Sequence, residues 1–213
     1  LSSAASDVYK RQEEADILVV DAVGEWATTS IMKAKGASIE VVEEQRFPDS
    51  IGLLYSSFTQ YLGFKVNSDE YKVMGLAPYG EKESTQTQEF IRIIEAVLIQ
   101  NNEIFPRLNL SYFSFQYGDR MIEDKKWEQL FGMPVRQPNE PLQQAHKNLA
   151  LAIQSVTETI LQKIIEDMKS ESISDNLCIC GGVALNCAAN GNLERKEIYS
   201  HTYVPFAPGD CGC

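Results

Sequence analysis

The pattern of apolar and polar positions predicts a group of closely spaced strands near the start of the chain. Residues 15–21 (ADILVVD) form a continuous apolar run that ends in an acid. Residues 27–34 (ATTSIMKA) and 37–47 (ASIEVVEEQRF) alternate in part between apolar and polar positions, with a turn at Lys35-Gly36 between them. Because the connections are short, we expect these strands to pair as an antiparallel meander.

Periodic apolar positions predict helices through the middle of the chain. The predicted helices span residues 50–62, 68–76, 87–100, 120–131 and 141–168. In the longest of them, apolar residues recur at intervals of three and four, so one stripe should face a core. The helix over 68–76 should be capped by Ser68 and should stop at Pro78-Tyr79-Gly80. A short strand is expected over 108–115.

The last part of the chain alternates between strand and helix. A buried strand is predicted over Asn176–Cys180, followed by a sharp turn at Gly181-Gly182, a helix as far as Leu193 and a last strand over 198–204. This order of elements looks like one lobe of the actin- and hexokinase-like (ASKHA) ATPase fold, in which parallel strands with crossover helices extend an antiparallel meander. We therefore expect an α/β domain over residues 13–213.

Composition and charge narrow the possible partners. Hydrophobic residues make up 44% of the chain and charged residues 23%, as in ordinary globular proteins, and the net charge is −11. A surface of this sign repels phosphate backbones, so we expect no nucleic-acid partner. We find no signal peptide and no apolar run near the ~18 residues of a membrane span, and we expect a cytoplasmic protein without a membrane partner. Residues 1–12 show no periodicity and are expected to be a disordered tail or a sequence-end artefact.

The five cysteines gather in the last quarter of the chain, which is not the spacing of a disulfide framework. Cys178 and Cys180 lie in the predicted buried strand, where cysteine behaves as a small hydrophobic residue. Cys211 and Cys213 have no partner pair at zinc-finger spacing. We therefore expect reduced thiols.

Candidate carboxylates follow the first and the last predicted strand. Asp21 ends the first strand, and the small residues after it, including Gly24, would let backbone N–H groups approach a phosphate or a metal-bound ligand. Asp210 lies just beyond the last strand. Carboxylate oxygens bind divalent ions readily, so Asp21 and Asp210 could converge on one metal ion. Taken singly, each also fits a plain alternative, which is a polar hairpin turn for residues 21–26 and a surface loop for Asp210.

A lysine and a pair of glycines add a candidate nucleotide site. Lys72, in the segment YKVMGLAPYG, offers a fixed cation for phosphate, although an ordinary helix stop with a solvated lysine explains this segment at least as well. Gly181-Gly182 would let a ribose or phosphate approach the backbone, and Asn186 could hydrogen-bond a ribose or base. Tight packing of a strand against a helix would also explain the glycines.

In combination, these stretches resemble one protein family. Over residues 17–210, the chain is similar to the carbamoyltransferases of the nodulation and antibiotic-tailoring type in the ordered motifs D-A-V-G-E-W, K-V-M-G-L-A-P-Y-G, C-G-G-V-A-L-N-C and P-G-D. The resemblance implies an ATP-dependent O-carbamoyltransferase. In such an enzyme carbamoyl phosphate is hydrolysed, and the carbamate is adenylated in a YrdC-like domain. The carbamoyl adenylate then moves to an iron-containing site in the actin-like-fold domain, where its carbamoyl group passes to a hydroxyl of a sugar, antibiotic or other natural product.

The resemblance also implies roles for residues of this chain. Metal binding is assigned to Asp21 and Asp210, catalysis to Asp21 and Lys72, and cofactor binding to Gly24, Glu25, Gly181, Gly182, Val183 and Asn186. The family also binds its metal through an H-x-x-x-H helix upstream of Asp21, for which this chain offers no match, and His146 and His201 are expected to be structural. We therefore expect a fragment, inactive alone, that works with the missing histidine segment and the YrdC-like domain of the same protein.

Other classes remain open on the sequence alone. A tRNA threonylcarbamoyl transferase shares the fold but must hold tRNA, and a net charge of −11 argues against it. A non-catalytic nucleotide-binding module of the actin-like fold would explain the Gly-Gly turn without requiring Asp21 and Asp210 to lie close together.

Overall fold

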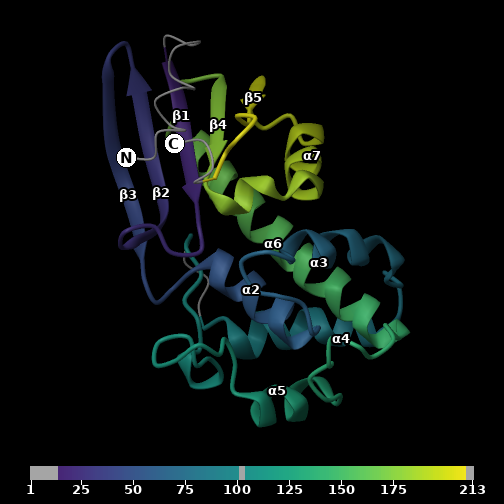
Figure 1. Ribbon diagram of the computed structural model, residues 1–213. Coiled ribbons are helices and arrows are strands. Elements are labelled where there is room, and N and C mark those ends of the chain that lie inside the picture. The colour runs from purple at the N-terminus through teal and green to yellow at the C-terminus, as the bar shows by residue number, and fades with distance from the viewer. Residues whose placement is uncertain (1–13, 101–103, 210–213) are drawn as a thin grey trace. The chain divides into compact units, whose positions relative to one another are not determined.

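A computed structural model (Figure 1) describes residues 14–100 and 104–209. The chain divides into two compact units. The first contains the described residues up to Gly52 and those from Ile160 onward, and the second is Leu53–Thr159. The single span predicted from the sequence therefore contains more than one unit.

The unit boundaries fall within helices. Gly52 and Leu53 both belong to α2 (Ile51–Tyr61), and Thr159 and Ile160 both belong to α6 (Gln144–Ser170), so each helix contributes to both units. Although α6 has 27 residues, it carries charged side chains along its length. In the part of the chain that the structure describes, no helix could span a bilayer.

The first unit is built on a five-stranded mixed sheet. Its strands are β1 (Glu14–Val20), β2 (Ala27–Lys35), β3 (Ser38–Arg46), β4 (Asn176–Cys180) and β5 (His201–Tyr203). They lie side by side in the order β3-β2-β1-β4-β5 (Figure 1). β2 is antiparallel to β1 and β3, whereas β4 is parallel to β1 and β5. The predicted meander and its parallel extension, and with them an α/β fold, are confirmed.

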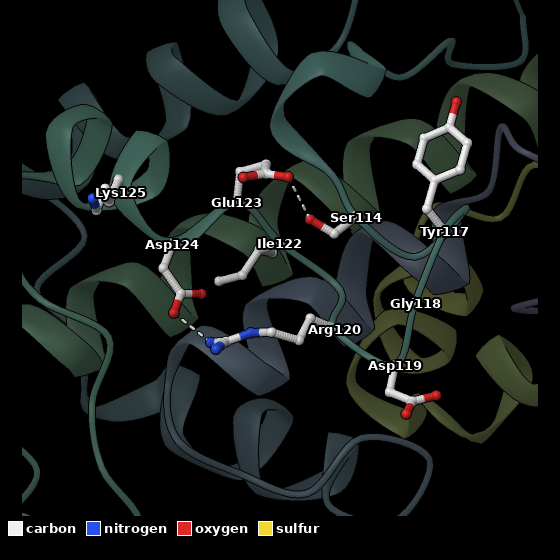
Figure 2. A pocket seen from close by; sticks show the side chains of 9 residues that line it. All are labelled: Ser114, Tyr117, Gly118, Asp119, Arg120, Ile122, Glu123, Asp124 and Lys125. Carbon is white, nitrogen blue, oxygen red and sulfur yellow. Dashed lines mark hydrogen bonds and ion pairs between the residues drawn. The ribbon is translucent and has the colours of Figure 1, made fainter.

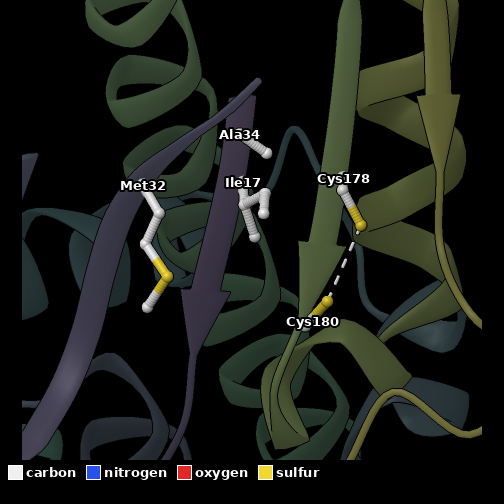
Figure 3. Close-up of a cluster of buried hydrophobic side chains, with 5 residues drawn as sticks. All are labelled: Ile17, Met32, Ala34, Cys178 and Cys180. Atoms are coloured by element: carbon white, nitrogen blue, oxygen red, sulfur yellow. Dashed lines mark hydrogen bonds between the residues drawn. The ribbon is translucent and has the colours of Figure 1, made fainter. Parts of the chain in front are cut away.

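One face of this sheet carries a buried apolar cluster that spans β1, β2 and β4 (Figure 3). Ile17 of β1 is in register with Met32 of β2 on one side and with Cys178 of β4 on the other. Together with Ala34 and Cys180, these side chains are almost fully shielded from solvent. β1 is paired on both sides, and both faces of a central strand are buried, which explains why its sequence is a continuous apolar run.

The thiols of Cys178 and Cys180 project from the same face of β4, as residues two apart on a strand do. Their Sγ atoms are 3.7 Å apart, and both are free thiols, as is the exposed Cys187. The prediction of reduced cysteines is confirmed for these residues, while Cys211 and Cys213 lie outside the described residues. The hydrogen bond with Cys180, together with burial, raises the pKa of the Cys178 thiol.

The helix predicted after the glycine pair is interrupted. A 3-10 turn, η4 (Gly182–Leu185), comes first, and α7 (Cys187–Arg195) follows it. Asn186 stands between them, and its side-chain oxygen accepts a hydrogen bond from the backbone N–H of Ala189 at 3.1 Å. This bond satisfies a helix N–H that has no backbone partner, so α7 has its own N-cap.

The second unit is helical. Besides parts of α2 and α6, it contains α3 (Glu70–Leu76), η1 (Ala77–Tyr79), α4 (Thr85–Ile93), the π-helix η2 (Ile94–Leu98), η3 (Leu110–Tyr112) and α5 (Asp124–Phe131). Its core contains aromatic rings from α2, α4 and α5. Trp127 lies edge-on to Phe58 with ring centroids 4.7 Å apart, and Phe131 contacts both Tyr61 and Phe90 at 5.6 Å. Contacts of this kind contribute ~0.5–1.5 kcal/mol each beyond the burial of their area.

The helix starts in this unit differ from the prediction for local reasons. Asp69, not Ser68, occupies the N-cap position of α3, and its carboxylate accepts a hydrogen bond from the Lys65 backbone N–H at 3.1 Å. α4 begins earlier than expected because Ser84 Oγ accepts a hydrogen bond from the Thr87 backbone N–H at 3.1 Å. The predicted Ser68 cap is therefore wrong, and the sequence signal at Ser84 was missed.

Two further expectations in this unit need correction. The strand over 108–115 is not formed; this segment contains η3 and pairs only through isolated bridges at Leu108 and Phe113. The long helix begins at Gln144 and not at Pro141. The Gln143 N–H, just before the helix, donates to Nδ1 of His146 at 2.9 Å, which caps this end.

Candidate functional site

Loops that follow parallel strands meet at one edge of the sheet in the first unit. Asp21 comes directly after β1, Gly181-Gly182 directly after β4, and residues 205–209 follow β5. Because β1, β4 and β5 are parallel, their carboxyl ends lie at the same edge. This is the edge at which open α/β sheets bind ligands. A carboxylate and a glycine pair that were singled out from separate motifs therefore belong to one edge.

The glycine pair lies against the end of β1. A Cβ atom on Gly181, whose φ is +91°, would stand 2.2 Å from the carbonyl oxygen of Val20, so only glycine fits there. A Cβ atom on Gly182 would stand 3.1 Å from Oδ1 of Asp21. The carboxylate of Asp21 thus faces a stretch of backbone that has no side chain.

The loop after β5 lies against the same glycine pair. The backbone N–H of Gly181 donates to the carbonyl of Pro208 at 2.8 Å. A Cβ atom on Gly209 would be 3.8 Å from the Cα of Gly182. Asp210 is the next residue along the chain and lies outside the described residues, so its predicted pairing with Asp21 stays a prediction.

Asp21 is half-buried and held by backbone hydrogen bonds. Its N–H donates to the carbonyl of Thr28 at 2.8 Å, which closes the hairpin between β1 and β2. Its Oδ1 accepts a hydrogen bond from the backbone N–H of Ala22 at 2.8 Å. The side chain is therefore directed by the peptide group that follows it.

The rest of the DAVGEW segment forms a tight, exposed turn. The N–H of Gly24 donates to the carbonyl of Ala27 at 3.0 Å, and a Cβ atom on Gly24 would lie 2.7 Å from that oxygen. This close approach is a structural reason for glycine at position 24. It fits the alternative in which residues 21–26 form a polar hairpin turn. Glu25 is exposed beside it, and the cofactor contacts predicted for Gly24 and Glu25 stay predictions.

Large apolar side chains project into solvent from the loops at this edge, a feature that the sequence analysis missed. Trp26 is 71% exposed, Leu185 63% and Phe206 92%. Each lies on a loop that follows β1, β4 or β5. Trp26 could have been identified from its position in the DAVGEW motif. No local sequence feature predicts that Leu185 and Phe206 are exposed.

Asn186 and Val183 lie just beyond the glycine pair. The Oδ1 of Asn186 serves as the cap of α7, which by itself accounts for an asparagine at this position. Val183 is half-buried in η4. The nucleotide contacts predicted for both residues stay predictions.

Lys72 belongs to the second unit and already has an anionic partner. Its Nζ lies 2.9 Å from the Asp69 carboxylate, and its side chain is 41% exposed. The hydrogen bond to Asp69 raises the pKa of Lys72, so the side chain stays charged at neutral pH. This arrangement fits a solvated ion pair on α3, and the catalytic role of Lys72 stays a prediction.

The YKVMGLAPYG segment has a structural role that its sequence did not reveal. A Cβ atom on Gly80 would lie 2.6 Å from Cβ of Leu151 on α6. The amide of Gln144 donates to the carbonyl of Tyr79 at 3.0 Å, and the N–H of Glu81 donates to Oδ1 of Asn148 at 2.9 Å. These hydrogen bonds hold the end of the motif against α6, and glycine at position 80 permits the two backbones to approach closely.

The donor set for a metal is incomplete in this part of the protein. Among residues 14–100 and 104–209, no group of three or more His, Cys, Asp and Glu side chains is placed to hold a metal ion. His146 is buried and accepts a hydrogen bond from the backbone, and His201 is exposed on β5. Among the described residues, Asp21 is thus not part of a group of three or more such ligands.

The second unit also has a shallow hollow of about 490 Å³ along the loop and helix start at residues 114–125 (Figure 2). Arg120 pairs with Asp124 and Ser114 donates to Glu123 at 2.9 Å, whereas Oδ1 of Asp124 is buried without a hydrogen-bond partner among the described residues. None of the motifs singled out from the sequence lies in this hollow.

Comparisons with known proteins agree with the motifs. Residues 4–213 match the family model described as the carbamoyltransferase N-terminus. The chain is 44% identical over 212 residues to the uncharacterized protein sll1178 of Synechocystis sp., an alignment that covers 99% of this chain and 34% of that protein.

Nodulation proteins are also similar to the chain. It is 34% identical over 204 residues to nodulation protein NolNO of Sinorhizobium fredii, covering 94% of this chain and 27% of that protein. It is 27% identical over 207 residues to nodulation protein NolO of Bradyrhizobium diazoefficiens, covering 94% of this chain and 33% of that protein. The chain spans about a third of the length of these curated relatives.

Proposed function

Since this chain belongs to the carbamoyltransferase family and matches its N-terminal part, we propose that it forms part of an ATP-dependent O-carbamoyltransferase. The donor is carbamoyl phosphate, the activated intermediate is carbamoyl adenylate, and the acceptor is a hydroxyl of a sugar, antibiotic or other natural product. The observation that carries the proposal is the carboxylate of Asp21 facing the bare backbone of Gly182 at the carboxyl edge of β1 and β4.

This geometry suits a nucleotide because it leaves room where a side chain would stand. Gly182 has no side chain, so the phosphate and ribose of an adenylate can approach its backbone, whereas the missing Cβ atom of Gly181 makes room for the Val20 carbonyl. We assign the adenosine to the segment Gly181–Asn186, with Gly24 and Glu25 on the opposite loop. The exposed rings of Trp26 and Phe206 supply apolar surface beside it.

Asp21 needs a cation or a proton donor to work next to a phosphate group. We propose that Asp21 and Asp210 hold a divalent ion, iron in the family, together with histidines outside the matched third of the relatives. Such an ion, when bound, polarises the mixed anhydride and stabilises charge on the departing phosphate. Asp21 contributes a carboxylate oriented by the Ala22 N–H. We propose that Lys72 is a cation for phosphate, and that it leaves Asp69 to pair with the phosphate of the substrate.

The proposed fold relationship rests on the sheet. The order β3-β2-β1-β4-β5, with an antiparallel meander followed by parallel strands, is the arrangement expected for one lobe of the actin- and hexokinase-like ATPases. Adenylation requires a further domain, which we propose to be YrdC-like and to belong to the same protein. We expect this chain alone to be inactive, because it would lack the adenylating domain and the histidine segment.

The experiment uses the full-length protein with ATP and ¹⁴C-labelled carbamoyl phosphate. We expect carbamoyl adenylate by chromatography and label on a hydroxyl acceptor. Asp21→Asn should lower transfer by about 100-fold or more, the scale of removing a group that stabilises a transition state. Asp167→Asn, at an exposed position on α6, is the control and should leave transfer unchanged. Nucleotide binding without adenylate or transfer would instead support the non-catalytic module.

A further inference from the structure

The start of α2 lies directly against the turn that carries Asp21. The hydroxyl of Ser50 is 2.7 Å from the carbonyl oxygen of Ala22 and 3.1 Å from the carbonyl oxygen of Asp21. Ser50 is completely buried. A serine hydroxyl has one proton, so it is shared between these acceptors or directed at one of them at a time.

Gly52 makes a second and independent contact with the same backbone. A Cβ atom built on Gly52 would lie 2.6 Å from Cα of Ala22, 2.7 Å from N of Ala22 and 2.7 Å from O of Asp21. All of these are backbone atoms, which cannot move aside as a flexible side chain can. Glycine at this position therefore lets the helix reach the turn.

Gly52 and the 3.1 Å contact of Ser50 fall on one peptide group, that between Asp21 and Ala22, while the 2.7 Å contact of Ser50 falls on the carbonyl of the next peptide group. The carbonyl of Asp21 and the N–H of Ala22 belong to the same planar unit, so they turn together. Ser50 donates to the carbonyl of this plane at 3.1 Å and the backbone of Gly52 packs against it, while its N–H donates to Oδ1 of Asp21 at 2.8 Å. The N–H thus supplies a hydrogen bond that orients the carboxylate.

We propose that Ser50 and Gly52 are positioning residues, which hold the Asp21–Ala22 peptide plane and thereby aim the Asp21 carboxylate at Gly182. This inference rests on the proposed function through the role given to Asp21. Neither residue belongs to a motif that the sequence analysis singled out. The N–H of Asp21 donates to Thr28 in the strand pairing, whereas the carbonyl oxygen of Asp21 accepts a hydrogen bond from Ser50, just before α2.

The test compares Ser50→Ala with Ser57→Ala in the full-length protein. Ser57 is the matched control, because it lies on α2, which Ser50 directly precedes, is also completely buried and donates to a backbone carbonyl, that of Leu53, at 2.8 Å. A displacement near 1 Å can cost about 100-fold in rate, so we expect Ser50→Ala to lower kcat by about tenfold to 100-fold. The KM for the acceptor should change by less than about threefold, because acceptor binding does not depend on this peptide.

Two further measurements separate positioning from general loss of structure. Ser50→Thr keeps the hydroxyl and should restore most of kcat. Amide hydrogen exchange should be at least about tenfold faster at Ala22 in Ser50→Ala and unchanged at Ala22 in Ser57→Ala, because only the first loses the support of that plane. If Ser50→Ala does not fold, Ser50→Cys, a weaker donor of similar volume, takes its place.

The outcomes are distinguishable. Equal kcat and equal Ala22 exchange in Ser50→Ala and Ser57→Ala would overturn the positioning role even if the wild-type enzyme is active. A wild-type protein that transfers no carbamoyl group would overturn the proposed function. In that case exchange at Ala22 still decides the geometry: faster exchange in Ser50→Ala alone supports it, and equal exchange overturns it.

Discussion

Oδ1 of Asp21 and Gly182 are so close that a single added methyl group would come within 3.1 Å of the carboxylate oxygen. This distance is tighter than ordinary van der Waals contact, yet the neighbour is the end of a side chain and can rotate away. A change at Gly182 should therefore disturb the orientation of Asp21 without unfolding the sheet.

Gly182→Ala should lower carbamoyl transfer by about tenfold or more through a misdirected carboxylate, while the free energy of unfolding changes by less than about 1 kcal/mol. Enzyme assays and urea titrations on the same preparation check both parts. Gly191→Ala is the control, because its Cβ would meet only Arg195 Nη1 at 3.5 Å and it lies inside α7. It should keep full activity and gain up to about 1 kcal/mol of stability. Equal activity in both variants would contradict the prediction.

Substitutions of Asn186 can separate its cap from its predicted nucleotide contact. Asn186→Ala removes the acceptor for the Ala189 N–H and should cost about 1 kcal/mol in unfolding free energy. Asn186→Asp keeps that acceptor but loses the amide donors. We expect Asn186→Asp to retain stability and to bind ATP more weakly, as measured by calorimetry on the full-length protein. Unchanged ATP affinity in Asn186→Asp would leave the residue with its cap role alone.

The buried thiols should resist alkylation in the folded protein. A hydrogen bond to Cys180 and burial raise the pKa of Cys178, so the Cys178 thiolate is scarce at pH 8, and Cys180 is protected by its complete burial. Iodoacetamide followed by peptide mapping should label the exposed Cys187 within minutes. Cys178 and Cys180 should become labelled only after denaturation. Rapid labelling of either in the native protein would contradict their burial in β4.

His146 should make the free energy of unfolding decrease as the pH decreases. Burial, with a smaller contribution from Arg136, lowers the pKa of His146 below 6.5, whereas Glu140 acts in the opposite direction. The Gln143 N–H bond to Nδ1 also requires the neutral ring. The unfolded chain therefore binds this proton first, and the contribution is complete above pH 6.5 and lost as the pH falls below it.

The measurement for His146 is a pair of urea titrations at pH 7.5 and pH 5.5. The wild type should lose more unfolding free energy between them than His146→Gln, whose amide oxygen can accept the same N–H without titrating. Equal losses in the two proteins would show that other groups account for the acid sensitivity.

The strands near Asp21 could be predicted because their signal is local. A continuous apolar run in β1, partial alternation in β2 and β3, and the short apolar run that became β4 follow from which faces are buried. The caps were less predictable, since Ser68, Asp69 and Ser84 are all competent cap residues. Ser84 caps α4 through its hydrogen bond with the Thr87 N–H, whereas Asp69 stands at the N-cap of α3 with its carboxylate on the Lys65 N–H and without a side-chain cap bond.

The sequence alone predicts the five strands of the sheet, the position of the glycine pair and the motifs that relate the chain to its family. That Gly182 faces Asp21, and that Ser50 and Gly52 contact the Asp21–Ala22 peptide, is known only from the structure. Periodicity reports whether a side chain is buried, not which backbone it meets. Contacts between residues about thirty or more positions apart depend on how the chain packs, so these contacts had to come from the structure.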